Sequence, residues 1–292
     1  MHSQFITVGS YRLHLLDAGH GPTVLLLHGF AGSAEDWRPT AEALVRRGYR
    51  VIAADALGFG RSDKPLDAPY SFELQVGLYA KLLDVLGVQR VCVMGHSMGG
   101  KYALAMALLR PERVSSVVLV SSDGFAEAPP MNRAGNLPFI VPAVLWLSAR
   151  PAVTRAMLNA AFVAPEVYVT PAIIERARAA LVGKANWQAL EAFSRRYDDH
   201  DLRLTGLRAR LGELRVPSLL VWGDSDQIFP LKSSGRAAAA EIYGAQLVVM
   251  PRCGHFPQVE ATRQFHGLLM GFLAATLDRA RLHAQSTPEA AL

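Results

Sequence analysis

The sequence predicts an α/β protein with a doubly wound, mostly parallel sheet of eight strands, and three observations support this. Short apolar runs recur along the chain without the alternation of a half-exposed strand, as expected for strands covered on both faces. Amphipathic stretches of helical length separate most of these runs. The 292 residues, 51% of them hydrophobic and 19% charged, are enough for one large domain with its own core.

The first two strands differ from the others, because residues 5–8 and 11–16 alternate between apolar and polar and are joined by a Gly-Ser pair. This pattern predicts an antiparallel hairpin at the N-terminal edge of the sheet. Six buried strands are predicted at residues 23–27, 49–54, 90–94, 115–120, 218–222 and 246–250. Amphipathic helices are predicted between them at residues 35–47, 72–86 and 232–242.

The alternation of strands and helices stops between Asp123 and Arg215, where the sequence is rich in Pro, Ala and Arg. Four helices are predicted there, at residues 143–148, 152–162, 171–182 and 185–197, and no strand of the parallel type. We therefore expect a core domain formed by residues 1–122 and 216–280. A helical cap of residues 123–215 would be inserted after the sixth strand, and residues 281–292 would form a frayed tail.

Composition narrows the classes of partner. The formal net charge of +5 comes from basic residues spread along the chain, whereas nucleic-acid-binding proteins cluster them, so we expect no nucleic-acid partner. The sequence has no signal-peptide pattern and no run of about 20 apolar residues, which predicts a cytoplasmic protein without a membrane span. Cys92 and Cys253 have neither disulfide nor metal-site spacing and are predicted to be free thiols. We expect a small-molecule substrate and a monomer or homodimer.

Ser97 is the candidate nucleophile. It is the central residue of a G-x-S-x-G motif, residues 95–99, which is informative here because a buried strand precedes it and a helix follows it. In this setting the serine occupies a strained turn that exposes its hydroxyl, and its neighbours must be small to let strand and helix approach each other. The N-terminus of the following helix would stabilise negative charge developing at Ser97.

With this motif the chain resembles the α/β-hydrolase superfamily, and in particular its capped esterases, carbon–carbon bond hydrolases, epoxide hydrolases and haloalkane dehalogenases. The resemblance extends from Phe5 to about Leu277, although the insert agrees only in position and helical character. It implies that an oxyanion hole is formed by the backbone N–H groups of Phe30, after the HG pair of "LLLHGF", and of Met98. His28 would orient this loop.

The resemblance also implies a catalytic acid and base. The pattern W-G-x-x-D-x-x-x-P aligns Asp226 with the acid, with Asp224 and Asp123 as competing positions. His255 in "MPRCGHF" is placed like the base. The D-x-x-G-x-G-x-S loop at 55–62 is expected to be structural, because a dinucleotide site requires a third glycine and a helix.

Four further histidines lie outside these motifs. His14, His200, His266 and His283 are most simply interpreted as surface residues.

These residues predict a serine hydrolase that cleaves a carboxylic ester of a small to medium, largely apolar substrate through an acyl-enzyme, without a metal or organic cofactor. A serine nucleophile argues against the dehalogenase and epoxide-hydrolase branches, which use aspartate. The alternative enzyme is a carbon–carbon bond hydrolase of the meta-cleavage-product type. We rank it second because His96 and Phe256 stand where that branch usually carries Asn and Trp. Perhydrolysis as a side activity and a non-catalytic ligand-binding role are the remaining alternatives.

Overall fold

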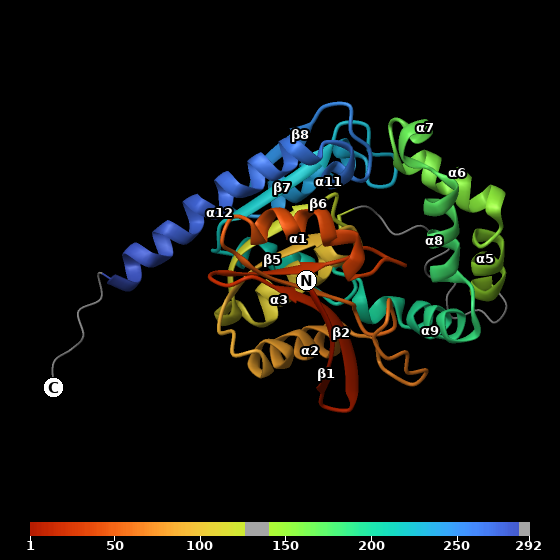
Figure 1. The fold of residues 1–292 in the computed structure, drawn as a ribbon, viewed down its shortest axis with the longest axis horizontal. Coiled ribbons are helices and arrows are strands. Elements are labelled where there is room, and N and C mark those ends of the chain that lie inside the picture. The colour runs from red at the N-terminus through yellow and green to blue at the C-terminus, as the bar shows by residue number, and fades with distance from the viewer. Residues whose placement is uncertain (126–139, 286–292) are drawn as a thin grey trace.

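A single eight-stranded sheet organises the protein, for which the computed structural model describes residues 1–125 and 140–285. The strand order is β1-β2-β4-β3-β5-β6-β7-β8 (Figure 1). The β1–β2 and β2–β4 pairs are antiparallel and all other pairs are parallel, so the predicted fold class, with its antiparallel N-terminal edge, is confirmed. The strands are β1 His2–Val8, β2 Tyr11–Ala18, β3 Thr23–Leu27, β4 Arg50–Ala54, β5 Val91–His96, β6 Val114–Val120, β7 Ser218–Gly223 and β8 Gln246–Met250.

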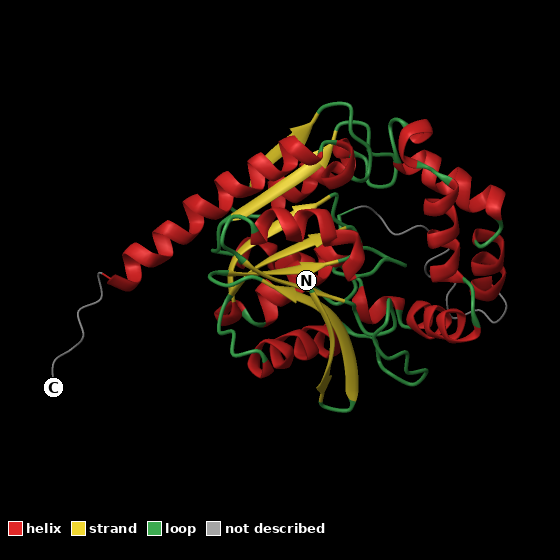
Figure 2. Cartoon of the chain, in the orientation of Figure 1, coloured by secondary structure: helices red, strands yellow, loops and turns green. Residues whose placement is uncertain are grey.

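Helices cover both faces of the sheet (Figure 2). Alternate residues of β3 enter separate cores, Leu25 and Leu27 on the face covered by α2 and α3, and Val24 and Leu26 on the face covered by α1 and α12. This two-sided burial explains why the strand sequences are continuously apolar. The helices of this layer are α1 Arg38–Val45, α2 Phe72–Val85, α3 Met98–Leu109, α10 Arg236–Glu241, α11 Pro257–Glu260 and α12 Thr262–Gln285.

Two predicted helices begin differently from expectation. The predicted helix at 35–47 is divided into a 3₁₀ turn, Ala34–Trp37, and α1, whose first turn contains Pro39. Proline is favoured in a first turn because its missing N–H is not needed there, which sets the start of the helix. The predicted helix at 232–242 opens with a π-helical turn, Leu231–Gly235, before α10.

A helical segment, defined as residues 140–215, lies beside the sheet domain, on the right in Figure 1. Its helices pack on one another, and no strand occurs among the residues described there. They are α5 Ile140–Ser148, α6 Pro151–Ala161, α7 Pro165–Tyr168, α8 Pro171–Leu181 and α9 Lys184–Arg195. Residues 126–139, which belong to the predicted cap, lie outside the described residues.

The C-terminal helix α12 reaches away from the body (Figure 1). Of the predicted tail at 281–292, residues 281–285 continue α12 and residues 286–292 lie outside the described residues. No described helix combines the length and apolar composition needed to cross a bilayer. Cys92 and Cys253 are buried free thiols, as predicted.

Candidate active site

Ser97 occupies a strained turn between β5 and α3. Its backbone has φ 53° and ψ −122°, a conformation that residues with a side chain rarely adopt. Glycine is required on both sides, because a Cβ at Gly95 would lie 2.1 Å from the Gly99 carbonyl oxygen and one at Gly99 would lie 2.2 Å from the Leu27 oxygen. The Ser97 N–H also donates to the Val120 oxygen at 3.0 Å. The turn therefore fixes Ser97 at the carboxyl edge of the sheet.

The HG loop passes directly against this turn. A Cβ on Gly29 would lie 3.2 Å from the Ser97 Cβ. His28 Nε2 accepts a hydrogen bond from the Ala56 N–H at 3.0 Å, and Nδ1 donates to the Gly29 oxygen at 2.7 Å. Burial lowers the pKa of His28, so its imidazole stays neutral and can make both bonds. The loop that carries Phe30 is thus oriented by His28, while the oxyanion-donor roles of Phe30 and Met98 stay predictions.

Asp226 lies beside His255, after the end of β7. The His255 Nδ1 is 3.0 Å from Oδ2 and 3.2 Å from Oδ1 of the carboxylate. Oδ1 also accepts from the N–H groups of Ile228 and Phe229, each at 2.9 Å. Burial alone would raise the Asp226 pKa, but the hydrogen bond to His255, its charge and the backbone donors outweigh burial and hold the pKa below its ordinary value. Asp226 is therefore ionised and hydrogen-bonded to the imidazole.

The two competing carboxylates lie elsewhere. Asp224 is exposed and accepts a hydrogen bond from the Ser225 hydroxyl at 2.7 Å. Asp123 forms an ion pair with Lys101, with 3.2 Å between Oδ2 and Nζ. Only Asp226 among the three is in contact with His255, which is the arrangement expected of an acid that orients a base.

His96 connects the serine turn to His255. Its Nε2 donates to the His255 carbonyl oxygen at 2.8 Å, and the two rings are 4.8 Å apart. Burial and the nearby His255 lower the pKa of His96 to about 3, so it is neutral. No hydrogen bond joins the Ser97 hydroxyl to His255 in the described part of the chain. In enzymes without substrate such bonds are often long and tighten only when substrate binds.

Glu260 is a positioning residue that the sequence did not reveal. Its Oε1 accepts from the Gly254 N–H at 2.9 Å, and its Oε2 accepts from the Val163 N–H at 2.8 Å. The His255 N–H donates to the Ala161 oxygen at 2.7 Å. Because Ala161 and Val163 belong to the helical segment, the loop that carries His255 is held by that segment as well as by the sheet domain.

Two histidines expected at the surface are buried, so that prediction was wrong. His14 is 1% exposed, with its Nδ1 2.8 Å from the Asp55 Oδ2, and His200 is 1% exposed and 3.2 Å from the Lys101 Nζ. Their partners are 41 and 99 residues away in the chain, so no local pattern could indicate burial. His266 is partly buried, and nothing is described of the His283 side chain.

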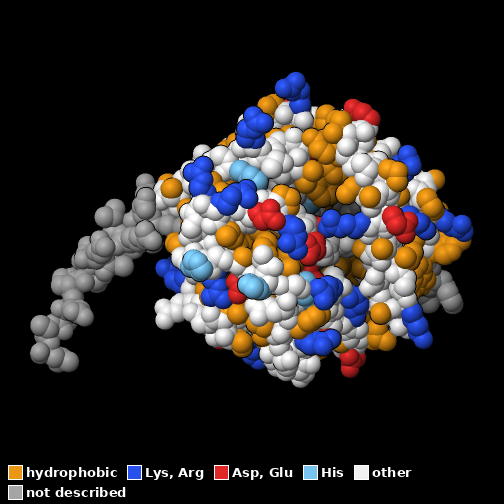
Figure 3. Space-filling model, in the orientation of Figure 1, with side chains coloured by type: hydrophobic (Ala, Val, Ile, Leu, Met, Phe, Trp, Pro, Cys, Tyr) orange, Lys and Arg blue, Asp and Glu red, His pale blue; other side chains and the backbone are white. Residues whose placement is uncertain are grey.

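Aromatic side chains gather where the helical segment meets the sheet domain. Phe193 of α9 lies 5.0 Å from Phe59, 5.7 Å from Tyr70 and 6.1 Å from Phe30, between ring centroids. The surface is hollowed in this region, with hydrophobic side chains gathered beside the hollow (Figure 3). A largely apolar substrate would suit such surroundings.

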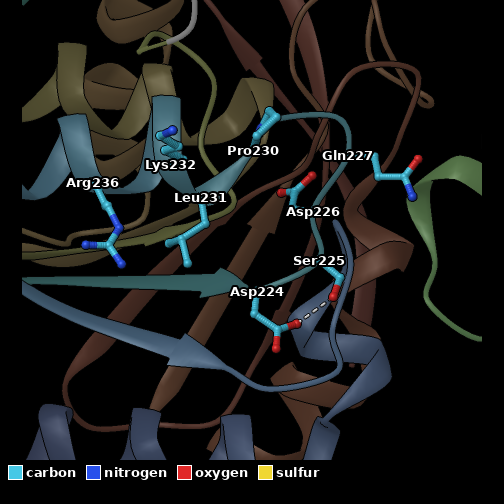
Figure 4. Close-up of a pocket in the computed structure, with 8 residues that line it drawn as sticks. All are labelled: Asp224, Ser225, Asp226, Gln227, Pro230, Leu231, Lys232 and Arg236. Atoms are coloured by element: carbon cyan, nitrogen blue, oxygen red, sulfur yellow. Dashed lines mark hydrogen bonds between the residues drawn. The ribbon is translucent and has the colours of Figure 1, made fainter.

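A recess of about 860 Å³ is lined by the loop after β7 and the turn that follows it, with residues such as Asp224, Lys232 and Arg236 (Figure 4). The Asp226 side chain is fully buried, so its carboxylate is not exposed in this recess. Among the described residues, no group of three or more His, Cys, Asp or Glu is arranged to hold a metal ion.

Comparison with known proteins gives consistent matches. Residues 22–163 and 173–262 match the family described as alpha/beta hydrolase fold. The chain is 31% identical to a 2-hydroxy-6-oxononadienedioate/2-hydroxy-6-oxononatrienedioate hydrolase of Cupriavidus pinatubonensis, over 93% of this chain and 95% of that protein. It is 32% identical to a 2-hydroxy-6-oxo-6-phenylhexa-2,4-dienoate hydrolase of Burkholderia cepacia, over 93% and 96%. The structure resembles a meta-cleavage product hydrolase from Pseudomonas fluorescens IP01, with a TM-score of 0.80 and 28% identity, over 93% and 97% of the two chains.

Proposed function

This chain belongs to the α/β-hydrolase family. We propose that it hydrolyses a carbon–carbon bond in a 2-hydroxy-6-oxodienoate, with Ser97, His255 and Asp226 as its catalytic triad. Relatives that share 31% and 32% of the sequence over nearly its whole length are named for this reaction. This support reverses the ranking reached from the sequence, which placed ester cleavage first.

The hydrogen bond between Asp226 and His255 is the observation that carries the catalytic assignment. It fixes the tautomer with the proton on Nδ1, which leaves Nε2 free to accept a proton from the Ser97 hydroxyl. Asp226 then stabilises the imidazolium as the serine oxygen attacks. The N-terminus of α3 and the N–H groups of Phe30 and Met98 would stabilise the negative charge that develops on the former carbonyl oxygen.

For a dienoate of this class, the bond to be broken joins C5 to the C6 carbonyl carbon. Tautomerisation first moves the proton of the C2 hydroxyl to C5, which gives a 2,6-dioxo compound. Ser97 Oγ attacks C6, and the electron pair of the C5–C6 bond leaves through C3=C4 to the C2 oxygen, which takes the proton from His255. The acyl group remains on Ser97. Water, activated by His255, then releases it as a carboxylic acid and restores the serine.

We further propose that residues 123–215 act as a cap that selects the substrate. The aromatic contacts between Phe193 and Phe30 place side chains of the helical segment beside the HG loop. Phe162, the residue that follows α6, stacks on Phe256, which is next to His255, with 4.8 Å between the ring centroids. Both contacts bring the helical segment to the catalytic residues, which supports a selective role.

The direct test is incubation with 2-hydroxy-6-oxo-6-phenylhexa-2,4-dienoate, followed through loss of its dienolate absorbance and appearance of benzoate. We expect turnover by the wild type and none by Ser97→Ala, because the substitution removes the hydroxyl group of the turn between β5 and α3. A fluorophosphonate that labels the wild type but not Ser97→Ala would show that the serine is activated. Labelling without dienoate turnover would contradict the carbon–carbon assignment.

Ester hydrolysis is the second candidate, and His96 and Phe256 favour it. Their rings lie 4.8 Å apart beside His255, at the two positions where the carbon–carbon branch usually carries Asn and Trp. The same triad would cleave a p-nitrophenyl ester through the same acyl-enzyme. Ester turnover that exceeds dienoate turnover by kcat/KM would favour this candidate, and binding of either compound without turnover would indicate a non-catalytic member of the fold.

A further inference from the structure

Lys101 is a buried cation that the proposed chemistry does not use. It lies on α3, four residues after Ser97, and is 3% exposed. Every other residue of α3 from Met98 to Leu108 is buried and uncharged. Removing an ammonium from water is costly unless it is paired and hydrogen-bonded, whereas an apolar side chain of similar length would pack at this position without that cost. A charge retained here requires an explanation.

The ammonium has two polar partners, an ion-paired carboxylate and a hydrogen-bonded imidazole. Its Nζ lies 3.2 Å from the Asp123 Oδ2 and 3.2 Å from the His200 Nδ1. The His200 Nε2 is 3.2 Å from the Phe193 oxygen and must donate to it, so Nδ1 carries the lone pair and accepts from Lys101. Burial, followed by the charge of Lys101, lowers the pKa of His200 well below its ordinary value, which keeps the ring neutral. The Nζ also lies 5.7 Å from the centroid of the Tyr197 ring. Because a lysine has three donors, the ammonium can donate to a further oxygen in addition to Asp123 and His200.

This cluster lies close to the nucleophile. The Asp123 N–H donates to the Ser97 oxygen at 3.0 Å, so the residue that pairs with Lys101 also contacts the serine turn. Four residues of α-helix rise about 6 Å, and a helical Cβ tilts toward the N-terminus, which directs the Lys101 side chain toward the Ser97 end of α3. The His200 ring stacks on Phe193 at 4.0 Å, and Phe193 contacts Phe30 of the HG loop.

We propose that Lys101, assisted by His200, binds a carboxylate of the substrate whose carbonyl Ser97 attacks. The Asp123 side chain is 27% exposed and can turn toward water, so it holds the ammonium in the free enzyme and yields it to the substrate. The substrate class is thus an acid with a carboxylate several bonds from the reacting carbonyl. The proposed 2-hydroxy-6-oxodienoate carries such a carboxylate at C1, so the inference rests on the proposed function and adds to it the residue that would bind this group.

The test compares an anionic and a neutral ester of similar length, mono-p-nitrophenyl glutarate and p-nitrophenyl valerate. In Lys101→Met we expect the ratio of their kcat/KM values, acid over neutral, to fall about 10- to 100-fold, mainly through KM, because one charge-assisted hydrogen bond is lost. Lys101→Arg should recover part of the ratio. The matched control is Lys81→Met, an exposed lysine of α2, for which the ratio should equal that of the wild type.

For Asp123→Asn we expect the opposite change in the acid-to-neutral ratio of kcat/KM values. Removing the internal carboxylate frees the ammonium, so the acid-to-neutral ratio should rise, whereas a purely structural role predicts that both esters are affected equally in both variants. An unchanged ratio in Lys101→Met would overturn the inference. If the esters are not turned over, the dissociation constant of the glutarate ester, measured with Ser97→Ala and with Ser97→Ala/Lys101→Met, gives the same comparison. Failure to cleave the dienoate, with a changed ratio, would contradict the carbon–carbon assignment alone.

Discussion

The Asp226 carboxylate shows how a short loop selects one of several acids. Two successive backbone N–H groups, of Ile228 and Phe229, bind Oδ1 and hold the carboxylate where Oδ1 and Oδ2 lie 3.2 and 3.0 Å from the His255 Nδ1. Asp224, two residues earlier, stays exposed. The sequence pattern around Trp222 and Pro230 favoured Asp226 over Asp224, and Asp226 is the one of the two that contacts His255, while its role as the catalytic acid stays a prediction.

We predict that Asp226→Asn lowers kcat by about 10⁴-fold while the fold is retained, because the amide cannot hold the His255 imidazole in the required tautomer. The measurement is steady-state hydrolysis of a p-nitrophenyl ester together with a thermal melt. Asp224→Asn is the matched control and should stay within twofold of the wild type. A large loss in Asp224→Asn with activity kept in Asp226→Asn would reassign the acid.

Among the helices and strands, the buried strands were the most predictable, since their short, continuous apolar runs are typical of strands covered on both faces. The observed strands begin or end within one or two residues of prediction except at the edge, where β1 extends back to His2. Helix starts were less predictable, because a 3₁₀ turn precedes α1 and a π-helical turn precedes α10, and the periodicity of the sequence shows neither. The short helix α7 was not anticipated.

The contact between α6, α11 and the His255 loop depends on Glu260, so we predict that Glu260→Ala destabilises the protein by about 2 to 4 kcal/mol. A hydrogen bond to a charged group contributes about 1.5 to 3 kcal/mol, and Glu260 accepts from both Gly254 and Val163. We expect kcat to fall more than KM rises, since the His255 loop loses its anchor. Urea unfolding and steady-state kinetics measure both effects.

Glu42→Ala on the exposed side of α1 is the matched control and should change stability by no more than about 0.5 kcal/mol. Equal effects in the two variants would show that Glu260 acts only as a surface charge.

Across the whole molecule, long-range polar pairs were beyond the sequence. Nothing near His14 in the chain indicates Asp55, and nothing near Lys101 indicates His200, because these pairs form only when the sheet and the helical segment are assembled. Motifs indicated the candidate site residues, because each motif is local in the sequence. The groups that surround the site come from separate elements and could be found only in three dimensions.

The buried histidines predict a protein that loses stability in mild acid. Burial lowers the pKa of His28, His96 and His200 below the ordinary value of 6.5. As pH falls below about 6.5 the unfolded chain therefore binds protons that the folded chain does not, and stability is lost, for His96 down to a pH of about 3. The lowered pKa of Asp226 acts in the same direction below its ordinary value of 3.8.

We accordingly expect the Tm to decrease steadily from pH 7 to pH 5 in a calorimetric or fluorescence melt. His200→Gln should show a shallower decrease, because each such histidine contributes up to about 1.4 kcal/mol per pH unit. A Tm that is constant over this range would contradict the neutral state of the three imidazoles.

The position of the helical segment also has an evolutionary consequence. Strands β6 and β7 pair directly, from Val117 with Ser218 to Val120 with Val221, although residues 121–217 separate them in the chain. The segment therefore connects two strands that are already paired neighbours in the sheet. Closing a longer connection between them costs only about 0.6 kcal/mol of loop-closure free energy for each doubling of its length. Such a segment can be lengthened, shortened or exchanged between relatives while the catalytic framework is inherited intact. Recombination at this junction is a route by which one ancestral enzyme could diversify, and by which an engineer could graft new selectivity.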